Sequence, residues 1–179
     1  ASETAEQIVV IGGGYIGLEA AAVARKLGVD VTVIEMAPRI LQRVAAPETS
    51  DWFRALHRAH GAVILEATGL DCLLGEGRVT GVRLSDGREL PADIVVMAVG
   101  IRPATGMAKA AGLDVERGIL VDDHMVTSDP AVLAVGECVQ HRGTCYGLVA
   151  PLWDMCRALA DHATGTPSGY AGSVTSTKL

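Results

Sequence analysis

The chain has 179 residues, of which 49% are hydrophobic, enough to bury the core of one domain and part of a second. Its net charge of −6 argues against a nucleic acid or an anionic membrane as a partner. No apolar run reaches the ~18–20 residues of a membrane span, and the polar first six residues are unlike a signal peptide. We therefore predict a cytoplasmic protein that binds neither nucleic acid nor membrane.

A glycine turn near the start of the chain is the most informative motif. A run of β-branched residues at 7–11 predicts a strand, and an alanine-rich helix is predicted over residues 14–27. Between them, Gly12, Gly14 and Gly17 have the spacing G-x-G-x-x-G. These glycines permit a sharp turn, the approach of a pyrophosphate to the backbone, and close packing of helix on strand. The positive end of the helix dipole would face the phosphates, although a turn needed only for packing is the alternative.

A second apolar strand is predicted from residue 29, and it ends on Glu35, 23 residues after Gly12. This spacing is close to that of a carboxylate that binds a ribose diol. Such a carboxylate repels a 2′-phosphate, which favours NAD over NADP. Arg39 and Arg43, in the predicted loop after this strand, keep NADP open as an alternative.

Hydrophobic spacing predicts which helix faces are buried. In the first helix the predicted inward residues are Ile16, Ala20, Val23, Ala24 and Leu27. A second helix is predicted over residues 47–60, with one apolar face formed by Trp52, Ala55, Leu56 and Ala59. A third strand is predicted over residues 62–65.

The pattern changes after residue 68. Three alternating segments, 69–74, 78–84 and 88–90, are separated by glycine-containing turns and predict an antiparallel meander. A buried parallel strand is predicted over residues 93–99. Beyond residue 103 the sequence predicts a short helix at 105–111, strands at 118–121 and 132–135, a helix at 151–162, and a loop after 165.

The four cysteines show no C-x-x-C pairing, and we interpret them as buried free thiols (Cys72, Cys138, Cys145, Cys156). Their spacing does not match a usual iron–sulfur run. We predict no metal ligand and no catalytic side chain. His141 and Arg142 are interpreted as surface polar residues rather than as an acid–base pair.

The order of these motifs resembles that in the NAD-binding domain of the two-dinucleotide flavoprotein reductases. The motifs are the glycine turn, the acid after the second strand, the meander and then the run Val99-Gly100-Ile101-Arg102-Pro103. Residues 127–130 followed by 134–137 are similar to the distal flavin motif of that family. In that motif an acid, usually Asp and here Glu137, hydrogen-bonds the ribityl chain of FAD. Residues 136–151 resemble the flavoprotein part of the nitrite reductase large subunit, whereas residues 39–44 are closer to ferredoxin and rubredoxin reductases.

The resemblance implies an α/β fold in two parts. Residues 1–103 would form a Rossmann-like NAD(P)H-binding domain with an antiparallel β-meander. Residues 104–179 would form the distal, incomplete part of an FAD-binding domain. Members of the family have an additional, earlier glycine fingerprint for FAD. We therefore expect a fragment of a longer reductase that is inactive alone.

The resemblance also implies that hydride passes from NADH to FAD and then to a metal-centre acceptor, giving nitrite reduction. The expected partners are the preceding FAD-binding segment and downstream iron–sulfur and sirohaem domains of the same polypeptide. One alternative is a ferredoxin or rubredoxin reductase that passes electrons to a small redox protein. Another is an NAD-binding module without chemistry of its own, and a homodimer is left open.

The resemblance also implies roles for individual residues. Tyr15 would cover the flavin until nicotinamide displaces it, and Glu19 would contact the carboxamide, although both could be ordinary first-turn residues. Arg43 would lie at the adenosine end, and Gly100 would let the nucleotide cross the strand end. The predicted cofactor-binding residues are Gly12, Gly13, Gly14, Tyr15, Ile16, Gly17, Glu19, Glu35, Arg43, Gly100, Gly136 and Glu137.

Overall fold

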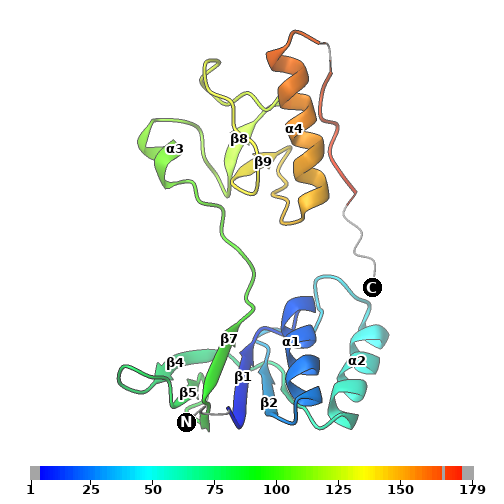
Figure 1. Ribbon diagram of the computed structural model, residues 1–179, viewed down its shortest axis with the longest axis vertical. Helices are drawn as coiled ribbons and strands as arrows, with labels where there is room; N and C mark the ends of the chain where they lie inside the picture. Colours follow the sequence, from blue (N-terminus) through cyan, green and yellow to red (C-terminus); the bar gives the residue numbers. More distant parts are fainter. Residues whose placement is uncertain (1–4, 167, 175–179) are drawn as a thin grey trace. The chain divides into compact units, whose positions relative to one another are not determined.

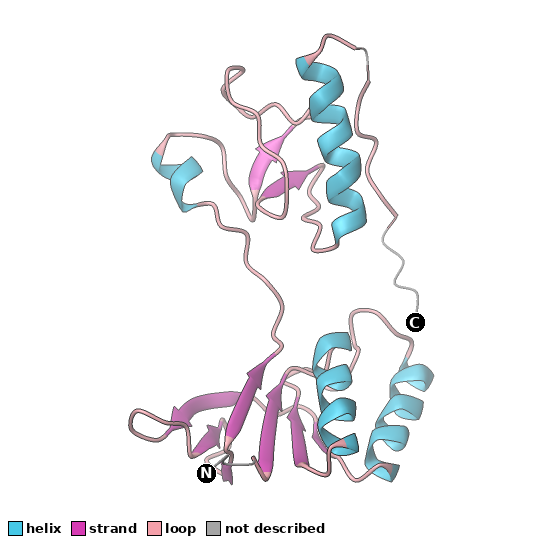
Figure 2. Ribbon diagram, viewed as in Figure 1, coloured by secondary structure: helices cyan, strands magenta, loops and turns pink. Residues whose placement is uncertain are grey.

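The computed structural model describes residues 5–166 and 168–174, which form two compact units. The first unit ends at Gly100 and the second begins at Ile101. Figures 1 and 2 show the helices and strands of each unit along the chain. The expectations for residues 1–4 and for the last five residues of the predicted C-terminal loop lie outside the described residues.

The first unit is built on a parallel sheet with the strand order β3-β2-β1-β7. Its strands are β1 (Gln7–Ile11), β2 (Asp30–Ile34), β3 (Val63–Leu65) and β7 (Ile94–Met97). On β1, Val10 packs into one core cluster, whereas Val9 and Ile11 pack into another on the opposite face. Because β1 is covered on both faces, its sequence is continuously apolar rather than alternating.

Two helices, α1 (Tyr15–Lys26) and α2 (Pro47–Ala59), lie side by side next to this sheet (Figure 2). The antiparallel meander β4 (Leu70–Leu74), β5 (Gly81–Leu84) and β6 (Glu89–Pro91) packs on the other face through residues such as Val82 and Leu84. The predicted α/β fold with a parallel sheet and a meander is therefore confirmed.

Helix α1 lies so close to β1 that a Cβ atom on Gly17 would overlap the carbonyl oxygen of Gly12. The side of α1 that faces the sheet consequently consists of small residues and one leucine (Gly17, Leu18, Ala21, Ala24). Our predicted inward face was right for Ala24, which is buried, and wrong for Ile16, Val23 and Leu27, which are exposed. Close packing selected small side chains, whereas the prediction followed the larger apolar ones.

The predicted face of α2 was also wrong, since Trp52 is 59% exposed and Leu56 is exposed as well. Ser50 and His57 are buried instead, and Phe53 packs against the core. Polar contacts fix this rotation of the helix: Arg54 pairs with Glu66 after β3, and Arg58 donates a hydrogen bond to a strand carbonyl of β3. Apolar spacing alone does not report such contacts.

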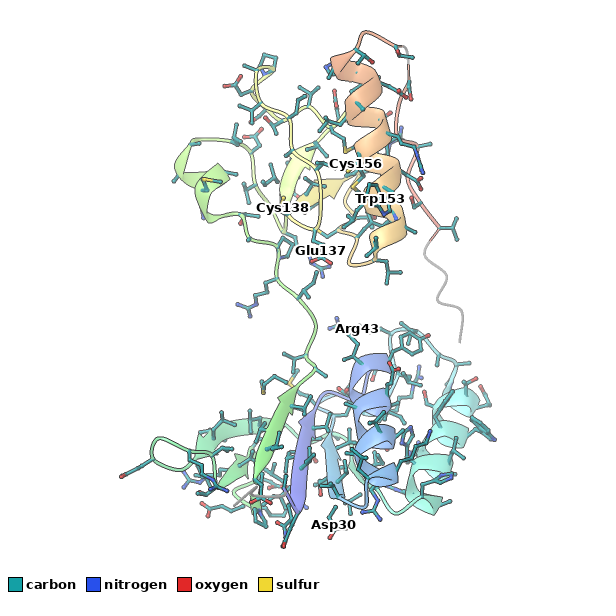
Figure 3. All side chains as sticks on the ribbon, in the orientation of Figure 1. Asp30, Arg43, Glu137, Cys138, Trp153 and Cys156 are labelled. Carbon is teal, nitrogen blue, oxygen red and sulfur yellow. The ribbon has the colours of Figure 1, made fainter. Side chains whose placement is uncertain are left out.

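The second unit contains the parallel pair β8 (Ile119–Val121) and β9 (Val139–His141), with helices α3 (Gly106–Ala110) and α4 (Val149–Ala163). Its core is formed by Met125, Val139, Tyr146, Met155, Ala158 and Tyr170. On α4, Trp153 lies outside this core and is 62% exposed. Figure 3 labels Trp153 and Cys156 on this helix.

The predicted strand at residues 132–135 was wrong, because only an isolated bridge joins Leu133 to Val126 there. The second strand of the pair is β9, which sequence reasoning missed. Gln140 is buried in β9, and its side chain accepts hydrogen bonds from the backbone N–H groups of Arg117 and Gly118. These bonds let a polar residue occupy an inner strand position.

The four cysteines are free thiols, but they are half-buried rather than fully buried as predicted. In residues 5–166 and 168–174, no helix combines the length and hydropathy that crossing a bilayer would need.

Gly17→Ala is expected to destabilise the chain, because the added methyl group would overlap the Gly12 carbonyl and displace α1. We expect a loss of about 1–3 kcal/mol in the free energy of unfolding, measured by urea titration. Gly14→Ala is the matched control, because its φ is −83° and a Cβ atom there would meet nothing within 4 Å. A change of more than about 1 kcal/mol in the control, or none in Gly17→Ala, would contradict the argument.

Candidate dinucleotide-binding site

The turn between β1 and α1 can be made only by glycine at its first position. Gly12 has a φ of +109°, and a Cβ atom there would clash with the carbonyl oxygen of Ala98. Its N–H donates to the carbonyl of Ile34 at 2.8 Å, which ties the turn to the end of β2. The turn therefore lies at the carboxyl edge of the sheet, where open α/β sheets bind ligands.

The amino end of α1 is open for an anion. Gly14 is the N-cap and makes no side-chain capping bond, and the space where its Cβ would stand is clear to 4 Å. The first N–H groups of a helix have no partner within the helix, and its dipole favours negative charge at this end. A diphosphate fits this environment, because its oxygens can approach these amides directly.

Glu35 follows β2 and its carboxylate is held beside the turn. Oε2 accepts a hydrogen bond from the Gly13 N–H at 2.7 Å, and Oε1 accepts one from the Ala37 N–H at 2.7 Å. A carboxylate has about four acceptor positions, so these two bonds leave capacity for ligand hydroxyls. A half-buried, oriented carboxylate next to an anion-binding turn suits a ribose joined to a diphosphate.

The two arginines of the segment after Glu35 differ in what they contact. The guanidinium of Arg39 donates to the carbonyl of Ala45 at 2.8 Å and to the hydroxyl of Ser50 at 2.9 Å. This arginine therefore fastens the segment to α2. Arg43 is exposed, and Figure 3 shows it at the end of the first unit opposite Asp30, which begins β2.

The other predicted residues of the first unit lie at the same carboxyl edge of the sheet. Tyr15 and Ile16 occupy the first turn of α1, where both are exposed, and Glu19 is exposed one turn later. Gly100 has a φ of +86° and follows β7. These four positions therefore lie on the side of the sheet where the glycine turn lies.

In the second unit, Gly136 has a φ of +110°, and Glu137 is exposed two residues before β9 begins. Sequence reasoning missed a further feature of this unit. Leu148, the N-cap of α4, makes no side-chain capping bond, and the first N–H groups of a helix have no partner within the helix. The proline in the first turn, Pro151, was the available indication of this helix start.

Our interpretation of His141 as a surface residue was wrong, because the side chain is only 1% exposed. Its Nε2 donates to the Asp123 carboxylate at 2.8 Å, and its ring packs against Tyr170. Arg142, which is exposed as predicted, donates to the same carboxylate through Nε and a terminal nitrogen. Hydrogen bonds from Arg142 and His141 lower the pKa of Asp123 from 3.8 to about 2. The three residues form a structural cluster that holds β9 to the preceding loop.

A cavity of about 300 Å³ lies in the first unit, away from the turn. Gln7, Asp30 and Val63, among its lining residues, begin three of the parallel strands. It therefore opens at the amino ends of the strands and is not part of the candidate site. Across the described part of the chain, no cluster of His, Cys, Asp and Glu side chains could hold a metal ion.

Comparison with known proteins identifies the family of the chain. The family model described as pyridine nucleotide-disulphide oxidoreductase matches residues 1–158. The chain belongs to this family. Members of the pyridine nucleotide-disulphide oxidoreductase family bind FAD and NAD(P)H.

Relatives of two kinds are about equally similar to the chain. It is 43% identical over 180 residues to nitrite reductase [NAD(P)H] of Bacillus subtilis (strain 168), covering 100% of the chain and 22% of that protein. It is 44% identical over 143 residues to putidaredoxin reductase of Pseudomonas putida, covering 78% of the chain and 34% of that protein. The crystal structure of the ferredoxin reductase for the CYP199A2 system from Rhodopseudomonas palustris superposes with a TM-score of 0.87 at 41% identity, over 95% of the chain and 44% of that structure.

The chain therefore spans less than half the length of each of these oxidoreductases. Similar identity to a nitrite reductase and to redox-protein reductases fixes the family but not the electron acceptor.

Asp123→Asn is expected to flatten the acid dependence of stability. Because the pKa of Asp123 is lowered in the folded state, its ionised carboxylate stabilises the fold above pH 3.8. This contribution to the free energy of unfolding is lost as the pH falls toward about 2. The thermal midpoint of the unmodified chain should therefore fall more steeply between pH 4 and pH 2 than that of the variant, as followed by circular dichroism. Parallel curves would contradict the role of this cluster.

Proposed function

We propose that the first unit binds NADH at the glycine turn, with residues 1–103 acting as the NAD(P)H-binding domain. The diphosphate would accept hydrogen bonds from the amides at the start of α1, around Gly14 and Gly17. The adenosine ribose would donate its hydroxyl hydrogen bonds to Glu35. Tyr15, Ile16 and Glu19 would then flank the nicotinamide side. Gly100 would lie at the strand end, and Gly13 would lie beside the Glu35 carboxylate that receives the ribose.

The observation that carries this proposal is the pair of hydrogen bonds that fix the Glu35 carboxylate beside Gly13. A carboxylate held in this way accepts ribose hydroxyls without further ordering and repels a 2′-phosphate. Arg39 is engaged with Ala45 and Ser50, so it is not positioned to neutralise that phosphate. Arg43 is the other arginine that left NADP as an alternative. We propose that it contacts the adenosine end of NADH.

We further propose that residues 104–179 form the distal part of an FAD-binding domain. Such a ligand has hydroxyl-rich and anionic parts. The Glu137 carboxylate suits its hydroxyls, and the turn at Gly136 and the amino end of α4 suit its anionic groups. FAD, when bound, supplies the acceptor for the hydride of NADH. The protein contributes the binding and orientation of both cofactors.

For the parent protein we propose NADH-dependent nitrite reduction, in which this chain is part of the large subunit and later domains carry iron–sulfur and sirohaem centres. The match to nitrite reductase over the whole chain supports this assignment. A ferredoxin or rubredoxin reductase is the second candidate, supported by the 44% identity to putidaredoxin reductase. Either activity fits a cytoplasmic protein that takes reducing power from NADH.

Titration of the chain with NADH and NADPH tests the nucleotide site. We expect NADH to bind about tenfold more tightly, because hydrogen bonds to a charged group contribute about 1.5–3 kcal/mol. Glu35→Ala should narrow this ratio to about threefold or less by removing both the acceptor and the repulsion.

Glu76→Ala, which removes an exposed acid from a meander turn, is the charge-matched control and should leave both affinities unchanged. Because Glu35 also bonds to the backbone, the thermal midpoint of each variant should be measured alongside. Equal affinity of the unmodified chain for NADH and NADPH would contradict the proposed role of Glu35 in selecting NADH.

The electron acceptor can be tested on the native polypeptide that contains this chain, with FAD bound. NADH-dependent loss of nitrite is expected. Reduction of a ferredoxin-type carrier without loss of nitrite would instead select the second candidate. Binding of NADH without oxidation by either acceptor would select an NAD-binding module.

A further inference from the structure

Glu66 connects the segment after Glu35 to the body of the first unit. It follows β3, and its side chain is 16% exposed. Oε1 accepts a hydrogen bond from the Ile40 N–H at 2.9 Å, and Oε2 lies 2.9 Å from Nε of Arg54 on α2. One carboxylate therefore joins β3, α2 and the segment of residues 36–46, which we call the adenosine segment.

The Ile40 position is also where the adenosine segment meets the glycine turn. Ile40 is fully buried, and its Cγ2 lies 2.6 Å from the point where a Gly13 Cβ would stand. The next N–H, that of Leu41, donates to the Gly13 carbonyl at 2.9 Å. Leu41 has a φ of +54°, so the chain is held in a left-handed conformation at this contact.

These contacts form a continuous path from Glu66 to the ligand-binding carboxylate. Glu66 holds Ile40, Ile40 and Leu41 contact Gly13, and the Gly13 N–H donates to Glu35. Arg43 is three residues beyond Ile40 on the same segment. Removal of the Glu66 carboxylate would therefore affect both Glu35 and Arg43, the two residues that we assign to the adenosine end. Glu66 itself contacts neither of them.

We propose that Glu66 is a positioning residue for the adenosine half of the nucleotide. It fixes the adenosine segment before the ligand binds, so that little ordering cost remains at the binding step. This inference rests on the proposed binding of NADH at the glycine turn. Glu66 lies outside the G-x-G-x-x-G motif, and it influences the affinity for the nucleotide through its hydrogen bond with the Ile40 N–H.

Two substitutions separate the hydrogen bond from the ion pair. Glu66→Ala leaves the Ile40 N–H without its acceptor inside the protein. Glu66→Gln keeps an oxygen that can accept this N–H but removes the charge opposite Arg54. Glu89→Ala is the matched control, because Glu89 pairs with Arg83 on the meander.

The probe is ADP-ribose, which has the adenosine and diphosphate of NADH but no nicotinamide, titrated calorimetrically against the 179-residue chain. Glu66→Ala should weaken its binding about tenfold, as expected when a buried donor loses its partner. Glu66→Gln should stay within about threefold of the unmodified chain, and Glu89→Ala should bind as the unmodified chain does. Without ligand, the Ile40 amide should exchange with deuterium faster in Glu66→Ala than in Glu66→Gln.

Failure of the unmodified chain to bind ADP-ribose and NADH would overturn the proposed function, and this inference with it. If the unmodified chain binds but Glu66→Ala binds equally well, only the positioning role is overturned. Equal weakening by Glu66→Ala and Glu66→Gln would also overturn it, because the Ile40 hydrogen bond would then not be the cause. A purely structural role would lower the thermal midpoint without changing the affinity of the folded chain.

Discussion

The contact of Gly17 with the Gly12 carbonyl sets the position of α1 on the sheet, and the candidate site depends on that position. A side chain at residue 17 would move the open end of the helix away from the end of β1. The parallel register then completes the arrangement, because Ile11 of β1 pairs with Ile34 of β2. The residues that follow these two strands are consequently neighbours, and the Gly13 amide meets the Glu35 carboxylate.

The site thus combines short-range and long-range supports. The Glu35 carboxylate is oriented by amides that adjoin it, one from the turn and one from its own segment. The segment itself is joined to the rest of the unit by Glu66, which accepts the Ile40 N–H, and by Arg39, which donates to the Ser50 hydroxyl on α2. Arg39 therefore has a structural role. A count of the basic residues near Glu35 overstates the positive charge that is available to a ligand.

Most of the first unit could be predicted from its sequence because its four parallel strands are rich in β-branched residues. The turn, the acid after β2 and the meander can each be predicted from a pattern of residues that are close together in the sequence. Helix faces could not be predicted in this way, since α1 turns its small residues inward and α2 is fixed by Arg54. Strand β9 and the burial of His141 were missed because the polar side chains of Gln140 and His141 form hydrogen bonds with partners distant in sequence. The partners of Glu35 and Glu66 likewise follow from tertiary contacts, which no motif contains.

The outward rotation of α2 has a practical consequence for spectroscopy. The chain has two tryptophans, Trp52 on α2 and Trp153 on α4, so each unit carries a single indole. Both indoles are more than half exposed, and their fluorescence should have the long emission wavelength of indole in water. Replacing either one with phenylalanine would leave a chain whose emission reports on one unit alone.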